Sequence, residues 1–319
     1  MDRGRRGNQV QGNCNRPRDT GPNRKTENRH HKREEINLAT HLQRLTNSTK
    51  LHLQKQFTEG ENMKELVTDL KAEQEALDKF VSTLKDEQWD LQTPAEGWSI
   101  KDSISHIAFF DEVSVLLMRG DNTPLEEAAK FGFDYTEVIA KRKRSMKPAQ
   151  LLDWWRNMRE TMDDMLMKSD PKARIPWFAL PMGARAFATA RLTETWAHGI
   201  DCYDAVGIEP VDTDRLRHVA TIAYMAMPYA YSVNSLEVPN TPIRLELVLP
   251  SGEPWNRGPE DATNIIRGTA SQFCRVAIRR RHWKDTKLEV IGSEAKRFIE
   301  IVQTYAGPPG PGRKPRSTA

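Results

Sequence analysis

Apolar residues recur at intervals of three, four and seven along most of the chain up to about residue 235. This period places them on one face of a helix, so it is typical of amphipathic helices that pack around a shared core. Breaks rich in Pro and Gly separate the segments. The pattern predicts helices at residues 63–89, 99–120, 125–145, 148–168, 184–206 and 212–232, with a connecting loop at 172–183.

The pattern changes after Pro239, where apolar and polar residues alternate as they do in half-buried strands. Extended segments are predicted at residues 243–249, 253–256 and 288–292. Helices are predicted over residues 260–281, interrupted at Gly268, and over residues 295–305. The predicted fold class is therefore mainly α, with an all-helical part followed by a small α+β part.

The two ends of the chain lack both patterns. Residues 1–60 hold 13 Lys or Arg against 6 Asp or Glu, although the whole chain has a net charge of only +4. Few aromatic residues and scattered charge favour disorder there. The extension is either a basic nucleic-acid-binding arm or a segment without function. The predicted organisation is a disordered basic extension, a helical bundle, a small α+β domain and a disordered tail, at residues 1–62, 63–235, 236–306 and 307–319.

The cysteine and hydropathy patterns bear on the compartment. No run of 18 or more apolar residues is present, and the N-terminus lacks the apolar segment of a signal peptide. The three cysteines, Cys14, Cys202 and Cys274, are too few for a disulfide framework and show no C-x-x-C spacing. We therefore expect a cytoplasmic protein with no membrane partner.

One helix carries a candidate metal site. Glu194 and His198 lie four residues apart in the segment 184–206, so their side chains share a face. Histidine is scarce after residue 62, and His106 points from the apolar face of another predicted helix. Two imidazoles and one carboxylate are a ligand set that leaves a position open on a divalent ion. The alternative is that these are ordinary core or surface histidines.

The residues around this candidate site resemble a known group of proteins. Gly97-Trp98-Ser99-Ile100-Lys101-Asp102 leads into His106, and Glu194-Thr195-Trp196-Ala197-His198 is followed by Asp201. This pattern resembles the DinB-like metal-binding superfamily, and within it the mycothiol-dependent maleylpyruvate isomerase-like proteins. The resemblance covers about residues 63–312. It implies a four-helix metal-binding domain, a smaller C-terminal α+β domain related to sterol carrier proteins, and a divalent ion, most often zinc, on His106, Glu194 and His198.

A second resemblance concerns the C-terminal part alone. Residues 266–281, with the run Arg279-Arg280-Arg281, and residues 306–310 resemble the short domain named for wyosine base formation. No radical iron–sulfur cysteine motif accompanies it, so tRNA modification is not expected.

The first resemblance implies a class of chemistry. The metal would hold the thiol of mycothiol as a thiolate, in an isomerase or a thiol transferase. A carboxylate substrate needs a fixed cation, and Arg191, on nearly the same face as Glu194, is the first candidate, with a structural salt bridge as the alternative. Arg185 at the start of the helix and Trp98 are candidates for cofactor binding, with core packing the alternative for Trp98.

The surroundings of the site carry further expectations. Asp201 and Asp111 are candidates for orienting the histidines, and Arg267 or Arg275 could close the site from the second domain. The expected partners are a small-molecule substrate or thiol rather than nucleic acid, and the chain is expected to be a monomer or a homodimer. The alternative function is a noncatalytic metal- or small-molecule-binding protein with a sterol-carrier-like ligand domain.

Overall fold

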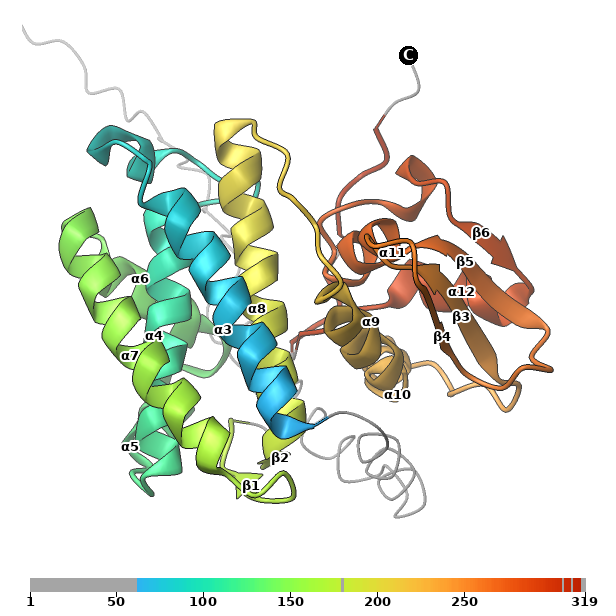
Figure 1. The fold of residues 1–319 in the computed structure, drawn as a ribbon, viewed down its shortest axis with the longest axis horizontal. Coiled ribbons are helices and arrows are strands. Elements are labelled where there is room, and N and C mark those ends of the chain that lie inside the picture. Colours follow the sequence, from blue (N-terminus) through green and yellow to red (C-terminus); the bar gives the residue numbers. More distant parts are fainter. Residues whose placement is uncertain (1–61, 179–180, 306, 311, 317–319) are drawn as a thin grey trace, which may run out of the picture. The chain divides into compact units, whose positions relative to one another are not determined.

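Four long helices lie side by side in the computed structural model, which describes residues 62–178, 181–305, 307–310 and 312–316 (Figure 1). They are α3 (Met63–Val81), α4 (Ile100–Met118), α7 (Pro148–Lys168) and α8 (Ala184–Val206). Helix α4 packs on α7 and α8, and α3 packs on the same two helices. Their inner faces are fully buried at residues such as Leu70, Ile104, Trp155 and Leu192. The predicted four-helix bundle is confirmed.

Local signals in the sequence set the ends of these helices. Asn62 accepts a hydrogen bond from the Lys64 backbone at the start of α3, and Ser99 forms a capping box with Asp102 at the start of α4. Helix α8 stops at Gly207, whose φ of 75° is unfavourable for other residues. Of the predicted extension at residues 1–62, residues 1–61 lie outside the described residues, and Asn62 is the N-cap residue of α3.

Three predicted segments are divided into, or contain, shorter elements. The first helix ends at Val81 and is followed by a 3-10 turn, η1 (Asp86–Asp90), before residue 99. The segment 125–145 is divided at Gly132, which has a φ of 57°, into α5 (Thr123–Phe131) and α6 (Tyr135–Lys143), with η2 (Gly132–Asp134) between them. The predicted loop at 172–183 holds two short paired strands, β1 (Arg174–Ile175) and β2 (Met182–Gly183).

The predicted helix at 212–232 is also divided, into α9 (Leu216–Met225) and α10 (Met227–Val233). Pro228 lies in the first turn of α10. Proline has no N–H to donate to the preceding turn, so α9 cannot continue through it.

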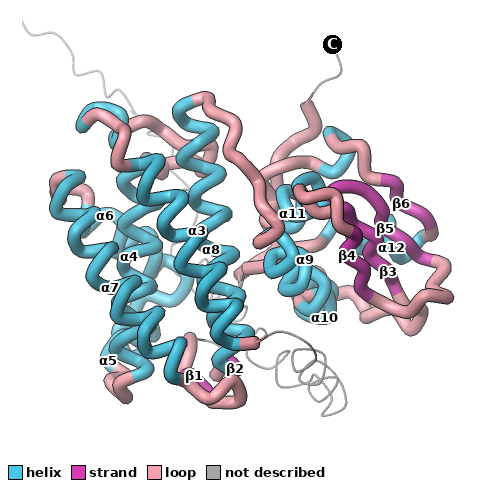
Figure 2. The backbone as a smooth tube through the Cα atoms, in the orientation of Figure 1, coloured by secondary structure: helices cyan, strands magenta, loops and turns pink. Residues whose placement is uncertain are grey.

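The C-terminal part contains a four-stranded sheet with helices beside it (Figure 2). The strand order is β4-β3-β5-β6, where β3 and β5 are parallel and the other pairs are antiparallel. The strands are β3 (Ile243–Val248), β4 (Pro254–Arg257), β5 (Asn264–Thr269) and β6 (Glu289–Ile291). The helices are α11 (Ala270–Ala277) and α12 (Ser293–Ile301), with a short η3 (Trp283–Asp285) before β6. The small α+β part of the predicted fold class is confirmed.

The prediction that a helix begins at residue 260 is wrong. Residues 264–269 form β5, an inner strand, and α11 begins only at Ala270. Asn264 and Ile266 are buried whereas Ile265 and Arg267 are not, which is the two-residue alternation of a strand. Gly268, at a φ of 152°, lies so close to Leu288 that a side chain would not fit. The pairing of residues 264–269 with β3 identifies this segment as a strand.

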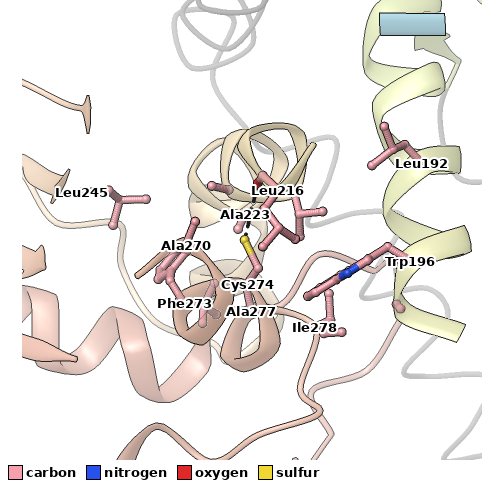
Figure 3. Close-up of a cluster of buried hydrophobic side chains, with 14 of the residues drawn as sticks. Leu192, Trp196, Leu216, Ala223, Leu245, Ala270, Phe273, Cys274, Ala277 and Ile278 are labelled. Atoms are coloured by element: carbon pink, nitrogen blue, oxygen red, sulfur yellow. Dashed lines mark hydrogen bonds between the residues drawn. The ribbon is translucent and has the colours of Figure 1, made fainter. Parts of the chain in front are cut away.

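The hydrophobic core continues across the predicted division near residue 235. Figure 3 shows Leu192 and Trp196 of α8 in a cluster with Leu216 of α9 and with Cys274 and Ile278 of the C-terminal part. The Cys274 thiol donates to the Leu216 carbonyl over 3.5 Å. Helix α9 packs against both α8 and α11. The C-terminal part is therefore packed against the helix that carries Glu194 and His198, and the domain boundary itself stays a prediction.

The end of the chain differs from the predicted disordered tail. The hydroxyl of Tyr229 donates to the Gly307 carbonyl and accepts from the Gly307 backbone N–H, over 3.0 and 2.7 Å. Arg279 donates to the Gly310 carbonyl over 2.6 Å. These hydrogen bonds hold residues 307–310 against the C-terminal part. Among the described helices, none is both long enough and apolar enough to span a bilayer.

Candidate metal centre

His106, Glu194 and His198 converge at one place in the bundle. Their ligand atoms all lie within 4.8 Å of one another. Oε2 of Glu194 is 3.7 Å from Nε2 of His106 and 3.5 Å from Nε2 of His198. These distances exceed a good hydrogen bond and are close to the roughly 3.3 Å between neighbouring ligands of a tetrahedral zinc ion. The three side chains singled out from the sequence are therefore brought together, and the ion itself stays a prediction.

Two helices position these side chains. Helix α8 presents Glu194 and His198 one turn apart, and α4, which packs on α8, presents His106 opposite them. The imidazole centroids of His106 and His198 are 4.6 Å apart. Because all three groups are on bundle helices and none is on a loop, their separation is fixed by helix packing.

The burial of His106, Glu194 and His198, and the protonation of His106 and Glu194, suit metal binding. The side chains of His106 and His198 are 12% and 11% exposed, whereas that of Glu194 is 30% exposed. Burial, with the neighbouring His198, lowers the pKa of His106 to about 4. Burial alone would raise the pKa of Glu194, but interactions with the two histidines hold it well below its ordinary value. At neutral pH, His106 is a neutral donor and Glu194 is ionised, which are the forms that metal ligands require.

Aromatic rings surround the two histidines. The Trp98 ring centroid is 5.1 Å from that of His106 and 5.8 Å from that of His198, nearly parallel to the latter. The Phe110 ring centroid is 4.7 Å from that of His106. Trp98 Nε1 donates to Glu137 over 3.1 Å, which fixes the indole. Trp98 is thus beside the site, and its role in cofactor binding stays a prediction.

Asp201 lies behind His198, where it was expected as an orienting residue. Its Oδ2 is 3.9 Å from Nδ1 of His198, which has no hydrogen-bond partner among the described residues. The Asp201 carboxylate is fully buried. Arg280 Nε donates to both of its oxygens, over 3.1 and 3.0 Å, and Nη2 of Arg313 donates over 3.5 Å. A negative charge is thereby held next to the imidazole that would bind the metal through its other nitrogen.

No role in the site is predicted from the sequence for Arg280 or Arg313. Arg280 follows α11, and Arg313 belongs to the segment 307–319 that was predicted to be disordered. The run Arg279-Arg280-Arg281 was visible as a charge cluster, but nothing local indicates that it reaches Asp201. Only the packing of the C-terminal part on α8 brings these arginines there.

Arg191 occupies a buried ion pair. Its guanidinium donates to Oδ1 of Asp111 through Nε and Nη2, over 3.1 and 2.9 Å, and to the Ile107 carbonyl over 3.3 Å. Its side chain is 3% exposed. Asp111 also accepts from Nε1 of Trp155 over 3.1 Å. The geometry thus matches the salt-bridge alternative for Arg191, and Asp111 holds this arginine and the indole instead of orienting a histidine.

The remaining predicted arginines lie farther from the three ligands or bind other groups. Arg185 is half-buried and precedes Glu194 by nine residues, or roughly 14 Å along the helix axis. Arg267 pairs with Glu246 and Glu289 on the sheet. Arg275 pairs with acidic residues after α8, Glu209 and Asp212. The expectation that Arg267 or Arg275 closes the site is therefore not supported by their contacts.

Comparisons with known proteins give the family. Residues 70–203 match the model described as the mycothiol maleylpyruvate isomerase N-terminal domain. The chain is 37% identical over 250 residues to the uncharacterized protein Rv0036c of Mycobacterium tuberculosis, covering 77% of this chain and 97% of that protein; the corresponding protein of a second strain matches equally. Two crystal structures of the mycothiol-dependent maleylpyruvate isomerase, one of a point mutant, match with a TM-score of 0.49 and 16% identity, over 69% of this chain and 90% of theirs. The chain belongs to the mycothiol maleylpyruvate isomerase-like family.

Proposed function

We propose that this protein binds a divalent ion, with zinc as the first candidate, through His106, Glu194 and His198. We propose further that the open coordination position of this ion binds a low-molecular-weight thiol, mycothiol. The observation that carries the proposal is the convergence of two imidazoles and one carboxylate at ligand–ligand spacing. The family match supports mycothiol as the thiol.

Each residue has a role in this proposal. Glu194 supplies the one negative charge of the ligand set, and His106 is held neutral by burial. Asp201, fixed by Arg280, stabilises a proton on Nδ1 of His198 and leaves Nε2 free to act as a ligand. Zinc bound there would lower the pKa of a thiol, so that it is a nucleophilic thiolate at neutral pH.

The surrounding residues shape the site. Trp98 and Phe110 exclude water from one side of the histidines, and we propose that Trp98 also contacts the cofactor. Arg191 ties α8 to α4 through Asp111, which keeps Glu194 and His106 at a fixed separation. Arg185 stays a candidate contact for the more distant part of the cofactor.

The reaction proposed first is isomerisation or thiol transfer. The second candidate is a noncatalytic binding protein that keeps the metal site. The observation in favour of the second candidate is the engagement of Arg191 by Asp111, because Arg191 was the arginine expected to hold a substrate carboxylate.

Metal analysis tests the site directly. We expect purified full-length protein to contain about one zinc ion per chain. His106→Ala and Glu194→Ala should each lose most of it, whereas His282→Ala, at a half-buried histidine outside the three, should keep it. Full metal content in both site variants would contradict the assignment.

Thiol binding and turnover separate the two candidate functions. Calorimetric titration with mycothiol should show binding to the zinc-loaded protein and none to the metal-free protein. Turnover of maleylpyruvate that requires mycothiol supports the enzyme. Thiol binding without turnover of maleylpyruvate or of an electrophile panel supports the binding protein.

A further inference from the structure

A second group of charged residues lies beside Asp201, and two of its members, Arg280 and Arg313, also bind the Asp201 carboxylate. A cavity of about 260 Å³ is lined by six basic side chains, with Asp204 and Asp285 as the acidic residues. The six are Arg280, Arg281, His282, Arg313, Lys314 and Arg316. An adjoining cavity of about 190 Å³ shares three of them. Concave sites lined by one sign of charge attract and concentrate ions of the opposite sign.

The fold gathers these residues from two distant segments. Arg279, at the end of α11, has a φ of 62°, an uncommon left-handed conformation for a long side chain, and the chain turns there. Its guanidinium donates to the carbonyls of Glu300 and Gly310 over 2.8 and 2.6 Å. A Cβ on Gly312 would lie 3.1 Å from this guanidinium, so glycine allows the tail to approach closely. Arg279 thereby joins the 280–282 segment to the 312–316 segment.

The basic residues of the cavity differ in their partners. Arg280 and Arg313 are engaged by Asp201. The side chains of Arg281, Lys314 and Arg316, by contrast, make no hydrogen bond or ion pair within the described part of the chain. Asp204 acts on Arg281 only at longer range, and Asp285 accepts from the backbone N–H of Arg316 over 3.0 Å. Three cationic groups are therefore available to an anion, next to two that are fixed in place.

We propose that this cavity binds a small phosphorylated anion through Arg281, Lys314 and Arg316. Guanidinium groups bind phosphate oxygens in pairs, and several around one hollow suit a group with more than one negative charge. The cationic groups converge on a cavity instead of following a groove, and acidic residues bound them, which favours a compact ligand over an extended nucleic acid. The site is separate from the three metal ligands and adds a binding function to the protein.

Calorimetric titration of the full chain with inorganic pyrophosphate at low ionic strength tests this proposal. We expect Arg281→Ala/Arg316→Ala to weaken binding at least tenfold. The control, Lys287→Ala/Lys296→Ala, removes the same charge from exposed positions of the C-terminal part and should change the affinity less than twofold. Because the side chains of Arg281 and Arg316 have no partner in the described residues, the melting temperature should not change. Lys314→Ala, at an exposed position, provides a second variant that leaves the fold intact.

Three results would overturn the proposal. Equal weakening in the two double variants would mean that only net charge matters. Citrate binding as tightly as pyrophosphate would remove the preference for phosphate. A twelve-nucleotide RNA that binds tighter than pyrophosphate, with equal loss in both double variants, would mean a diffuse nucleic-acid surface. Zinc content should be unchanged in Arg281→Ala/Arg316→Ala, so failure of the anion site is distinguishable from failure of the metal site.

Discussion

Asp163 is a carboxyl group that the fold keeps away from water inside the bundle. It is 2% exposed and accepts a 3.4 Å hydrogen bond from Gln74. Burial, together with the negative charge of Asp111, raises the pKa of Asp163 to about 8. In the folded protein this group therefore keeps its proton at neutral pH, which costs stability because the unfolded chain would release it.

The sign of the resulting pH dependence follows from the two pKa values. Between the ordinary value of 3.8 and about 8, the folded carboxyl holds a proton that the unfolded carboxyl has lost. Stability therefore falls as the pH rises through this window. Asp163→Asn removes the proton requirement, and we expect it to stabilise the protein by about 2 kcal/mol at pH 8 and less at pH 5.

Urea unfolding at several pH values checks this prediction. Asp164→Asn, at the neighbouring position, is the control, because its side chain is 57% exposed and contacts Lys71 at the surface. The control should follow the wild-type pH dependence. A difference between wild type and Asp163→Asn that does not grow from pH 5 to pH 8 would contradict the buried, protonated state.

At the level of elements, the long helices could be predicted and the short strand β5 could not. Helices α4, α7 and α8 have an apolar stripe over several turns and clear end signals such as Ser99 and Gly207, so local information suffices. Strand β5 has six residues, and the acidic pair Glu260-Asp261 that precedes it resembles a helix N-terminus. It forms because it pairs with β3, which is far away in the sequence.

The candidate site likewise contains residues that could be predicted from the sequence and residues that could not. Glu194 and His198 could be identified because their spacing is local to one helix, and His106 because histidine is scarce in the folded part. The environment of Asp201 could not be predicted, because Arg280 and Arg313 reach it only after the C-terminal part has folded onto α8. Arg191 was predicted to bind a substrate carboxylate because it lies on nearly the same helix face as Glu194. The carboxylate that binds it comes instead from Asp111 of α4.

The ion pair between Arg191 and Asp111 is the clearest link between α8 and α4. Both side chains are almost completely buried, so removing one leaves the other charge without compensation. We expect Arg191→Leu to destabilise the protein by about 3–5 kcal/mol. The double variant Arg191→Leu/Asp111→Asn should recover much of that loss, because the buried charge is gone and the amide oxygen can still accept from Trp155.

Urea unfolding of the three proteins measures these differences. If Arg191 were a substrate-binding residue instead, Arg191→Leu would abolish activity and leave stability within 1 kcal/mol or so of wild type. That result would return Arg191 to the role first expected from the sequence.

For the molecule as a whole, the C-terminal part and the metal-binding helix form one connected structure. Trp196 of α8 lies in the core shared with α9 and α11, and Arg275 is over its ring at 5.8 Å. Two cationic side chains from the C-terminal part, those of Arg280 and Arg313, reach Asp201. Through these two arginines, the C-terminal part therefore contacts the residue that lies behind His198. This contact does not depend on a ligand bound to the C-terminal part.

Asp201→Asn tests whether this contact affects the metal centre. The amide keeps the size of the side chain but removes the negative charge that faces Nδ1 of His198. Partners of metal-bound histidines change metal affinity by about 10- to 100-fold when they are removed, and because the contact here is 3.9 Å we expect the lower end of that range. The measurement is zinc affinity by competition with a chromogenic chelator, at a temperature where circular dichroism shows the variant to be folded.

 

The control is Asp204→Asn, because Asp204 lies one turn beyond Asp201 on α8 and makes no hydrogen bond or ion pair with His106 or His198 among the described residues. It should bind zinc as tightly as wild type. If Asp201→Asn also keeps wild-type affinity, Asp201 serves only to bind Arg280 and Arg313, and the C-terminal part acts on the fold without acting on the metal centre.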